Sequence, residues 1–323
     1  MLSRRQLLSA GALLPSSLGA TACRDREALR EPGPERAQGL AANTARRVRE
    51  VAQLAESQPT VEGAGVHLRR CLGGRAVPLL DPFLMLDEFR SETPEDYIKG
   101  FPSHPHRGFE TVTYMIDGAM EHRDSLGNHG RLAPGSVQWM TAGRGIIHSE
   151  MPKQDRGPMW GYQLWVNLPA REKMRKPRYQ DLAPERITMT TVGDASARLV
   201  AGEIGGAKGP VVDIATAPLM VDLALKKGGL ELPIPASYNA FVYVIEGAAR
   251  FGSSRPVPRG QLVVLGPGDV LRASTDDAAR FLLFAGKPIG EPIARRGPFV
   301  MNTDEELQQA FDDYRSGRLV QEG

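Results

Sequence analysis

The sequence predicts an all-β fold made of two tandem barrels, each of the double-stranded β-helix, or jelly-roll, type. From Val66 onward, short runs of alternating apolar residues end at Gly, Pro, Asn or Asp, while long helical patterns are few. Similar runs occur in both halves of the chain, and residues 169–186, which lack alternation, separate the halves. Two similar β domains therefore explain the pattern better than one large sheet.

The expected elements follow in chain order. In residues 111–116, Val112, Tyr114 and Ile116 alternate with the residues between them, and residues 117–118, an Asp-Gly pair, mark a tight hairpin turn. Six further runs predict strands, at residues 137–140, 162–168, 220–225, 241–245, 262–265 and 281–284. Residues 305–314 predict a short C-terminal helix.

The first 22 residues predict a twin-arginine export signal. Arg4 and Arg5 precede the apolar stretch 7–18, which is too short to cross a bilayer as a helix. Small residues at 20–22 provide a cleavage site directly before Cys23. We therefore expect a periplasmic protein. A lipoprotein anchored to the membrane through Cys23 is the alternative, although Ala20 stands where such signals normally carry Leu.

The rest of the chain divides into three parts. Residues 23–60 are rich in Arg, Glu, Ala and Gln and predict a polar tether, in which residues 37–58 could form a helix. Residues 61–176 are then the N-terminal barrel, and residues 177–318 are the C-terminal barrel.

Charge and cysteine content exclude several classes of protein. Forty basic residues against 38 acidic ones give a formal net charge of +2, which indicates no nucleic-acid partner. The two cysteines, Cys23 and Cys71, are too few for a disulfide framework or for a zinc site with several thiolates. Any metal site must therefore use imidazole and carboxylate groups.

Every histidine lies before residue 149, so only the N-terminal barrel can hold an imidazole-based metal site. The six are His67, His104, His106, His122, His129 and His148. In a strand, the rings of His104 and His106 leave the backbone on the same face, and the pair His148 and Glu150 repeats this spacing. Three imidazoles and one carboxylate suit iron, manganese, nickel, cobalt or copper. The C-terminal barrel is expected to bind no metal.

Spacing alone leaves the carboxylate ligand undecided. Glu150 belongs to the second pair, but Glu110 lies four residues after His106 and would share its face if the strand ran unbroken. Pro105 cannot donate to a sheet ladder, which predicts that the first pair lies at a strand edge or bulge. His122 and His129 flank a turn-like stretch and are expected either to support the ligands or to be exposed, and for His122 we favour the supporting position.

Long motifs closely resemble the pirin family. They include LDPFLMLDEF at residues 80–89, HPHRGFETVTYMIDG at 104–118, VQWMTAGRGIIHSEMP at 137–152, FVYVIEG at 241–247 and GPFVMNT at 297–303. The resemblance covers about residues 61–318. Pirins are bicupins, proteins of two cupin barrels, and their N-terminal barrel holds one non-haem iron. The resemblance therefore implies Fe2+ bound by His104, His106, His148 and Glu150, and it selects Glu150 over Glu110.

The resemblance also implies a function. Some pirins cleave the flavonol quercetin with dioxygen, whereas animal pirins are nuclear, redox-dependent transcriptional cofactors. We expect a quercetin 2,3-dioxygenase that binds a small aromatic or enolisable substrate and O2, with Glu150 as a ligand or as the base that takes the substrate's hydroxyl proton. Two alternatives stay open: a non-catalytic, iron-dependent redox-sensing or binding protein, and an oxygenase or isomerase of another enolisable substrate. The export signal argues against a role in transcription.

Overall fold

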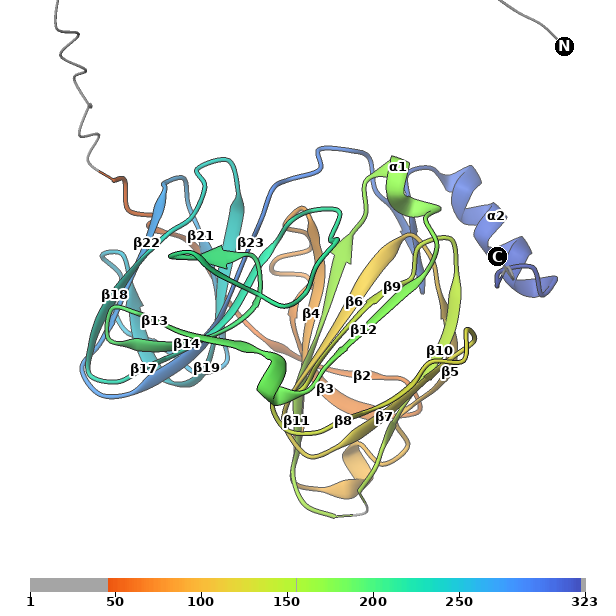
Figure 1. The fold of residues 1–323 in the computed structure, drawn as a ribbon, viewed down its shortest axis with the longest axis horizontal. Helices are drawn as coiled ribbons and strands as arrows, with labels where there is room; N and C mark the ends of the chain where they lie inside the picture. Colours follow the sequence, from red (N-terminus) through yellow and green to blue (C-terminus); the bar gives the residue numbers. More distant parts are fainter. Residues whose placement is uncertain (1–45, 155, 321–323) are drawn as a thin grey trace, which may run out of the picture. The chain divides into compact units, whose positions relative to one another are not determined.

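The computed structural model describes residues 46–154 and 156–320 (Figure 1). The expected export signal, Cys23 and the first part of the expected tether lie outside these residues. Within them, no helix combines the length and the apolar character needed to cross a membrane. The described residues form two β barrels and a short C-terminal helix, α2 (Asp304–Arg315). This arrangement confirms the fold class and the helix expected at residues 305–314.

Two antiparallel sheets build the N-terminal barrel. The larger sheet contains, in spatial order, β12 (Arg178–Leu182), β9 (Val137–Thr141), β6 (Phe109–Asp117), β11 (Met159–Asn167), β4 (Phe83–Ser91), β3 (Val66–Leu72) and β2 (Gln58–Glu62). The smaller sheet contains β5 (Phe101–His106), β10 (Ile146–Pro152), β7 (Met120–Asp124) and β8 (His129–Leu132). The strands expected at 111–116, 137–140 and 162–168 are β6, β9 and β11. Both predicted ligand pairs lie in the smaller sheet.

The C-terminal barrel is built around one larger sheet. Its main path is β1 (Val51–Glu56), β21 (Gln261–Leu265), β19 (Asn239–Phe251), β23 (Ala279–Gly286), β17 (Leu219–Leu225), β14 (Ala195–Ala201) and β13 (Thr188–Val192). Strands β18 (Gly228–Pro233), β20 (Val257–Pro258) and β22 (Val270–Thr275) pair beside this path. The four strands expected in this half of the chain are β17, β19, β21 and β23. Buried aliphatic and phenylalanine side chains pack inside the barrel as one apolar cluster.

Shorter elements connect and flank the barrels. They are η1 (Pro94–Asp96), α1 (Ala170–Lys173), η2 (Pro184–Arg186), β15 (Glu203–Ile204), β16 (Ala207–Lys208), β24 (Ala294–Arg296) and β25 (Phe299–Met301). Helix α2 begins directly after Thr303, whose hydroxyl accepts from the N–H of Glu306 in a capping box. This cap explains why the helix starts at the residue after Thr303.

Each barrel is completed by a segment from the opposite part of the chain. Strand β1 precedes the N-terminal barrel but pairs with β21 of the C-terminal barrel, with Leu54 opposite Val263. Strand β25 follows the C-terminal barrel, yet the Val300 N–H donates to the carbonyl of Arg107 at 3.0 Å. The buried ammonium of Lys173 also donates to the Val300 carbonyl, at 2.9 Å. The terminal segments therefore hold the two barrels together.

This exchange of segments corrects three expectations. The helix expected over residues 37–58 is wrong for all of its described residues: residues 46–50 are not helical, and from Val51 onward the chain forms β1 and β2. Residues 51–60 are accordingly part of the strands rather than of a tether. The N-terminal barrel also extends past residue 176, because β12 pairs with β9. The reason is that partners distant in the sequence supply the ladder hydrogen bonds, which local composition does not reveal.

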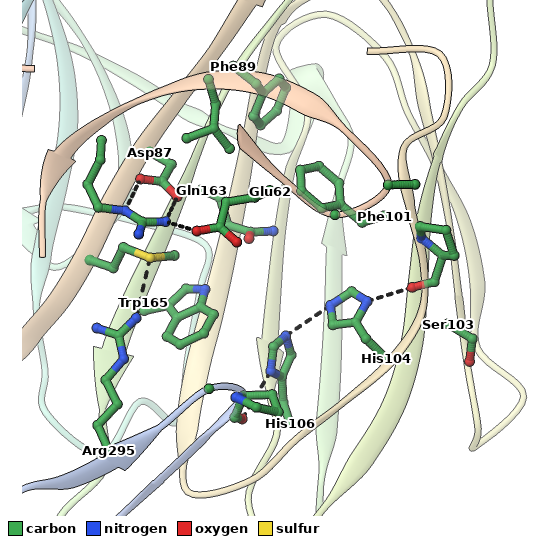
Figure 2. Close-up of a pocket in the computed structure, with 18 residues that line it drawn as sticks. Glu62, Asp87, Phe89, Phe101, Ser103, His104, His106, Gln163, Trp165 and Arg295 are labelled. Carbon is green, nitrogen blue, oxygen red and sulfur yellow. Dashed lines mark hydrogen bonds and ion pairs between the residues drawn. The ribbon is translucent and has the colours of Figure 1, made fainter. Parts of the chain in front are cut away.

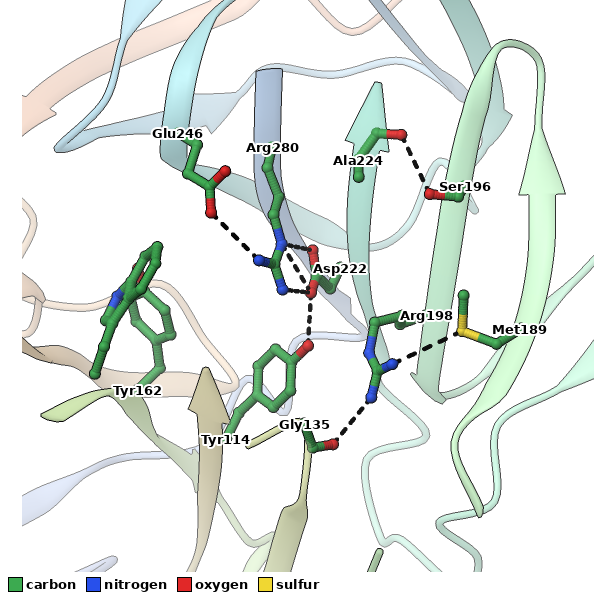
Figure 3. A network of polar contacts seen from close by, with 11 residues as sticks. Tyr114, Gly135, Tyr162, Met189, Ser196, Arg198, Asp222, Ala224, Glu246 and Arg280 are labelled. Carbon is green, nitrogen blue, oxygen red and sulfur yellow. Dashed lines mark hydrogen bonds and ion pairs between the residues drawn. The ribbon is translucent and has the colours of Figure 1, made fainter. Parts of the chain in front are cut away.

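The barrels pack against each other through one face of each larger sheet. The shared apolar cluster includes Val112, Tyr114 and Leu164 from one barrel and Phe241, Tyr243 and Leu282 from the other. Polar contacts cross the same interface (Figure 3): the Tyr114 hydroxyl donates to Asp222 at 2.6 Å, and Arg198 donates to the Gly135 carbonyl at 3.0 Å. Arg280, from the same barrel as Asp222, donates to that carboxylate at 2.7 Å and holds it in place. These directional bonds fix the relative position of the two sheets.

Candidate metal centre

Strands β5 and β10 bring the two predicted ligand pairs together. The strands are neighbours, and His148 pairs directly opposite His104. Strand β5 lies at the edge of its sheet, with Pro105 opposite Ile147, which confirms the edge position expected for this proline. The register shifts between His148 and Glu150, so that Glu150 lies opposite Phe101.

The rings of His104, His106 and His148 converge on one point. Their centroids are 4.3 to 4.9 Å apart, and the Nε2 atoms of His104 and His106 are separated by 3.1 Å. Nδ1 of His104 contacts the Pro102 carbonyl at 2.8 Å, and Nδ1 of His106 contacts the Pro298 carbonyl at 3.2 Å. A carbonyl can only accept, so Nδ1 of these two rings carries the hydrogen and Nε2 presents a lone pair. Each of the three rings offers one ligand atom within 4.8 Å of the others.

Burial keeps two of these rings neutral. Desolvation, and then the neighbouring His104, lower the pKa of His106 well below its usual value. Desolvation and the surrounding histidines lower the pKa of His148 in the same way. Nε2 of His148 is buried and has no hydrogen-bond partner within the described residues. A metal ion would supply the missing partner for this nitrogen, and neutral imidazole is the form that binds metals.

Glu150 is held in place by two neutral donors. Its side chain is buried, and Thr113 donates to one carboxylate oxygen while Gln163 donates to the other, both at 2.8 Å. Its oxygen lies within 4.8 Å of ligand atoms of His122 and His148. The candidate ligand atoms thus form two groups: His104, His106 and His148 make up one, and His122, His148 and Glu150 the other. His148 belongs to both groups, so it links the four predicted ligands. Together they form a His/His/His/Glu group that could bind a metal.

His122 takes a larger part in the site than the sequence indicated. It lies opposite Glu150 in the pairing of β7 with β10, and its Nδ1 is 3.4 Å from Nδ1 of His148. Its Nε2 faces the buried carboxylate of Asp124 at 3.6 Å. A hydrogen on Nε2 of His122 leaves its Nδ1 free to accept from Nδ1 of His148, which in turn leaves Nε2 of His148 for a metal. The spacing of His122 and Asp124, two residues apart on one strand face, was the available sequence signal.

Glu110 does not join the site. Strand β5 ends at His106, Gly108 turns the chain with a φ of 89°, and β6 begins in the other sheet. Glu110 is fully buried, and it accepts from the Thr141 hydroxyl at 2.6 Å. It alternates with Thr113, which reaches Glu150, so its side chain leaves β6 on the opposite face. Burial raises the pKa of Glu110 to about 7.

A cavity of about 590 Å³ adjoins the histidines (Figure 2). His104, His106 and Gln163 lie along it. Its apolar and aromatic lining comes from Leu68, Met85, Phe89, Phe101 and Trp165, and its charged lining from Glu62, Arg70, Asp87 and Arg295. A cavity of this size and character is typical of a small-molecule site. The candidate metal centre is therefore open to an organic ligand.

Comparisons with known proteins indicate one family. Family models match at residues 65–166 (Pirin) and 220–320 (Pirin C-terminal cupin domain). A pirin-like protein of Caulobacter vibrioides is 48% identical, covering 84% of this chain and 99% of its own length. Pirin of Rattus norvegicus is 42% identical, covering 83% and 92%. The crystal structure of quercetin 2,3-dioxygenase from Acinetobacter baumannii matches with a TM-score of 0.78 at 32% identity, covering 84% of this chain and 98% of that one. The chain therefore belongs to the pirin family.

Proposed function

We propose that this protein is a mononuclear metal-dependent dioxygenase that cleaves flavonols such as quercetin with O2. The observation that carries the proposal is that His104 and His106, two rings of the three-histidine cluster, line an aromatic-walled cavity of about 590 Å³. A pocket of that volume suits a planar ligand of two or three rings. The similarity to a structure described as a quercetin 2,3-dioxygenase supports the same reaction class.

His104, His106, His148 and Glu150 are the residues proposed to hold the metal, with Fe2+ proposed first and Mn, Ni, Co and Cu as alternatives. When bound, the ion supplies the Lewis acidity and redox capacity that cleavage of a flavonol by dioxygen requires. The burial of His106 and His148 favours their neutral, ligating form.

The chain's own groups do the remaining work. Thr113 and Gln163 orient the Glu150 carboxylate, whose remaining lone pairs can accept the proton of a flavonol hydroxyl. Phe89 and Phe101 provide apolar cavity wall that excludes water from the resulting enolate. Binding, orientation and proton acceptance are thus assigned to residues that line or adjoin one cavity.

Aerobic incubation of metal-loaded protein with quercetin tests the proposal. We expect the flavonol absorbance to fall with at least one of iron, manganese, nickel, cobalt or copper. Glu150→Gln should slow this loss, because the amide removes the anionic ligand of the proposed set and also accepts protons poorly, whereas Glu110→Gln should retain the wild-type rate. No turnover with any of the five metals, at confirmed metal occupancy, would refute the proposed reaction.

We also propose export to the periplasm by the twin-arginine route, on the basis of Arg4, Arg5 and the apolar stretch that follows. Fractionation of bacteria that express the full chain tests this. The wild type should appear in the periplasmic fraction and an Arg4→Lys, Arg5→Lys variant in the cytoplasm; an equal distribution would contradict export. Release of a Cys23→Ser variant from the membrane fraction would instead identify the lipoprotein alternative.

A further inference from the structure

Two arginines with different partners, Arg70 and Arg295, line the cavity, and Figure 2 shows Arg295 beside Trp165. Arg70 is paired: its Nε and Nη2 donate to the two oxygens of buried Asp87 at 2.9 and 2.8 Å, and Nη2 also donates to Glu62 at 2.9 Å. Two carboxylates of the same barrel therefore balance the charge of Arg70.

Arg295 comes from β24, in the segment that follows the C-terminal barrel. Its guanidinium lies 4.8 Å from the centroid of the Trp165 ring, and its other contacts are the Leu84 carbonyl at 3.3 Å and the Met85 sulfur at 3.6 Å. Within the described part of the chain, no carboxylate forms an ion pair with it. Burial, and then the charge of Arg70, lower its pKa, while the more distant carboxylates of Asp87 and Glu62 raise it; an anion against the guanidinium would also raise it.

Trp165 connects this arginine with the candidate metal centre. One side of the indole contacts the His106 ring, with centroids 5.2 Å apart. The side chain is 8% exposed, and its Nε1–H is buried without a hydrogen-bond partner among the described residues. The indole is therefore held in place by its ring contacts and not by a hydrogen bond of its own.

We propose that Arg295 and Trp165 form a subsite for the carboxylate of an aromatic substrate whose enolisable end faces His104 and His106. The inference rests on the proposed function and deepens it, because it assigns a charge to the substrate's far end. A guanidinium binds a carboxylate through two parallel hydrogen bonds, which a neutral isostere cannot form equally well. Stacking of Arg295 on Trp165 for packing alone would give no such selectivity.

Matched ligand pairs test the subsite without turnover. Metal-loaded protein is titrated anaerobically with 3-hydroxyflavone-4′-carboxylate and its methyl ester, and with naphthalene-2-carboxylate and naphthalene-2-carboxamide. We expect the carboxylate of each pair to bind about tenfold more tightly, the increment of one charge-assisted hydrogen bond. Arg295→Gln should bring the affinity ratio of carboxylate to neutral ligand close to one, and Arg295→Lys should retain part of the carboxylate preference. Arg296→Gln is the matched control, because that guanidinium lies over Phe311 instead.

The outcomes separate this subsite from the proposed reaction. A carboxylate preference in the naphthalene pair, without binding of either flavonol, would support the subsite and contradict flavonol chemistry. Equal affinities within the naphthalene pair, no binding of that pair, or a preference that survives in Arg295→Gln would overturn the subsite. Metal content and circular dichroism of each variant show that the fold and the centre are intact when the ratio changes.

Discussion

Replacement of Glu110 by Gln should remove a pH-dependent loss of stability. Glu110 is fully buried, and Thr141 donates to only one of its oxygens, while the other has no partner within the described residues. Desolvation raises its pKa from 4.5 to about 7. The carboxylate form is therefore disfavoured in the folded protein relative to the unfolded chain.

The sign and size of the effect follow from this shift. The pKa is higher in the folded state, so the folded protein binds the proton more tightly than the unfolded chain does. The contribution of protonated Glu110 to the unfolding free energy is fully present below pH 4.5 and is lost as the pH rises through about 7. A shift of about 2.5 pKa units corresponds to about 3 kcal/mol of unfolding free energy.

Urea unfolding of metal-free wild type and Glu110→Gln, in steps from pH 4.5 to 8, measures the effect. Between pH 4.5 and 8, we expect the unfolding free energy of Glu110→Gln to rise by about 3 kcal/mol relative to that of the wild type. Contributions from the histidines are common to both proteins and cancel in the difference. Thr141 can still donate to the side-chain amide oxygen of the Glu110→Gln variant. If burial of the new N–H groups costs stability, that cost does not vary with pH, so the pH dependence of the difference is unchanged. Parallel pH profiles would refute the reasoning.

Three further predictions concern the candidate centre and the interface between the barrels. Glu150→Gln should lose most bound metal, measured by elemental analysis, because it removes the only anionic group of the proposed set, whereas Glu110→Gln should retain it. His122→Gln should weaken metal binding about 10- to 100-fold in competition with a chelator, because it no longer orients His148. Asp222→Ala should lower the unfolding free energy in urea by about 2–4 kcal/mol, because it leaves Arg280 and the Tyr114 hydroxyl without their shared acceptor.

Exposed residues of the same types provide the controls. His129→Gln should leave metal affinity unchanged, since His129 is exposed and pairs with Glu121 away from the centre. Asp276→Ala should leave the unfolding free energy close to that of the wild type, since its ion pair with Arg250 is exposed to solvent. An effect of His129→Gln as large as that of His122→Gln would contradict the orienting role. Equal losses of unfolding free energy in Asp222→Ala and Asp276→Ala would contradict the stabilising role proposed for Asp222 at the interface between the barrels.

Much of the fold could be predicted from the sequence because it depends on local properties. Alternation in residues 111–116 identified β6, and similar runs identified six further strands. The two-residue spacing of His104 and His106 placed both rings on one face of β5, since side chains alternate along any strand. The position of Pro105 also predicted an edge strand correctly, because proline lacks the N–H that a central strand needs.

By itself, then, the sequence determined these seven strands, their faces, and the barrel that carries the imidazoles. The tertiary structure decided the rest. The turn at Gly108 put Glu110 on the face between the barrels, pairing across β7 and β10 brought His122 to Glu150, and return of the C-terminal segment placed Arg295 in the cavity. The physical reason is that the face a side chain takes is set by its own strand, whereas its neighbours are set by hydrogen bonds and packing between residues far apart in the chain.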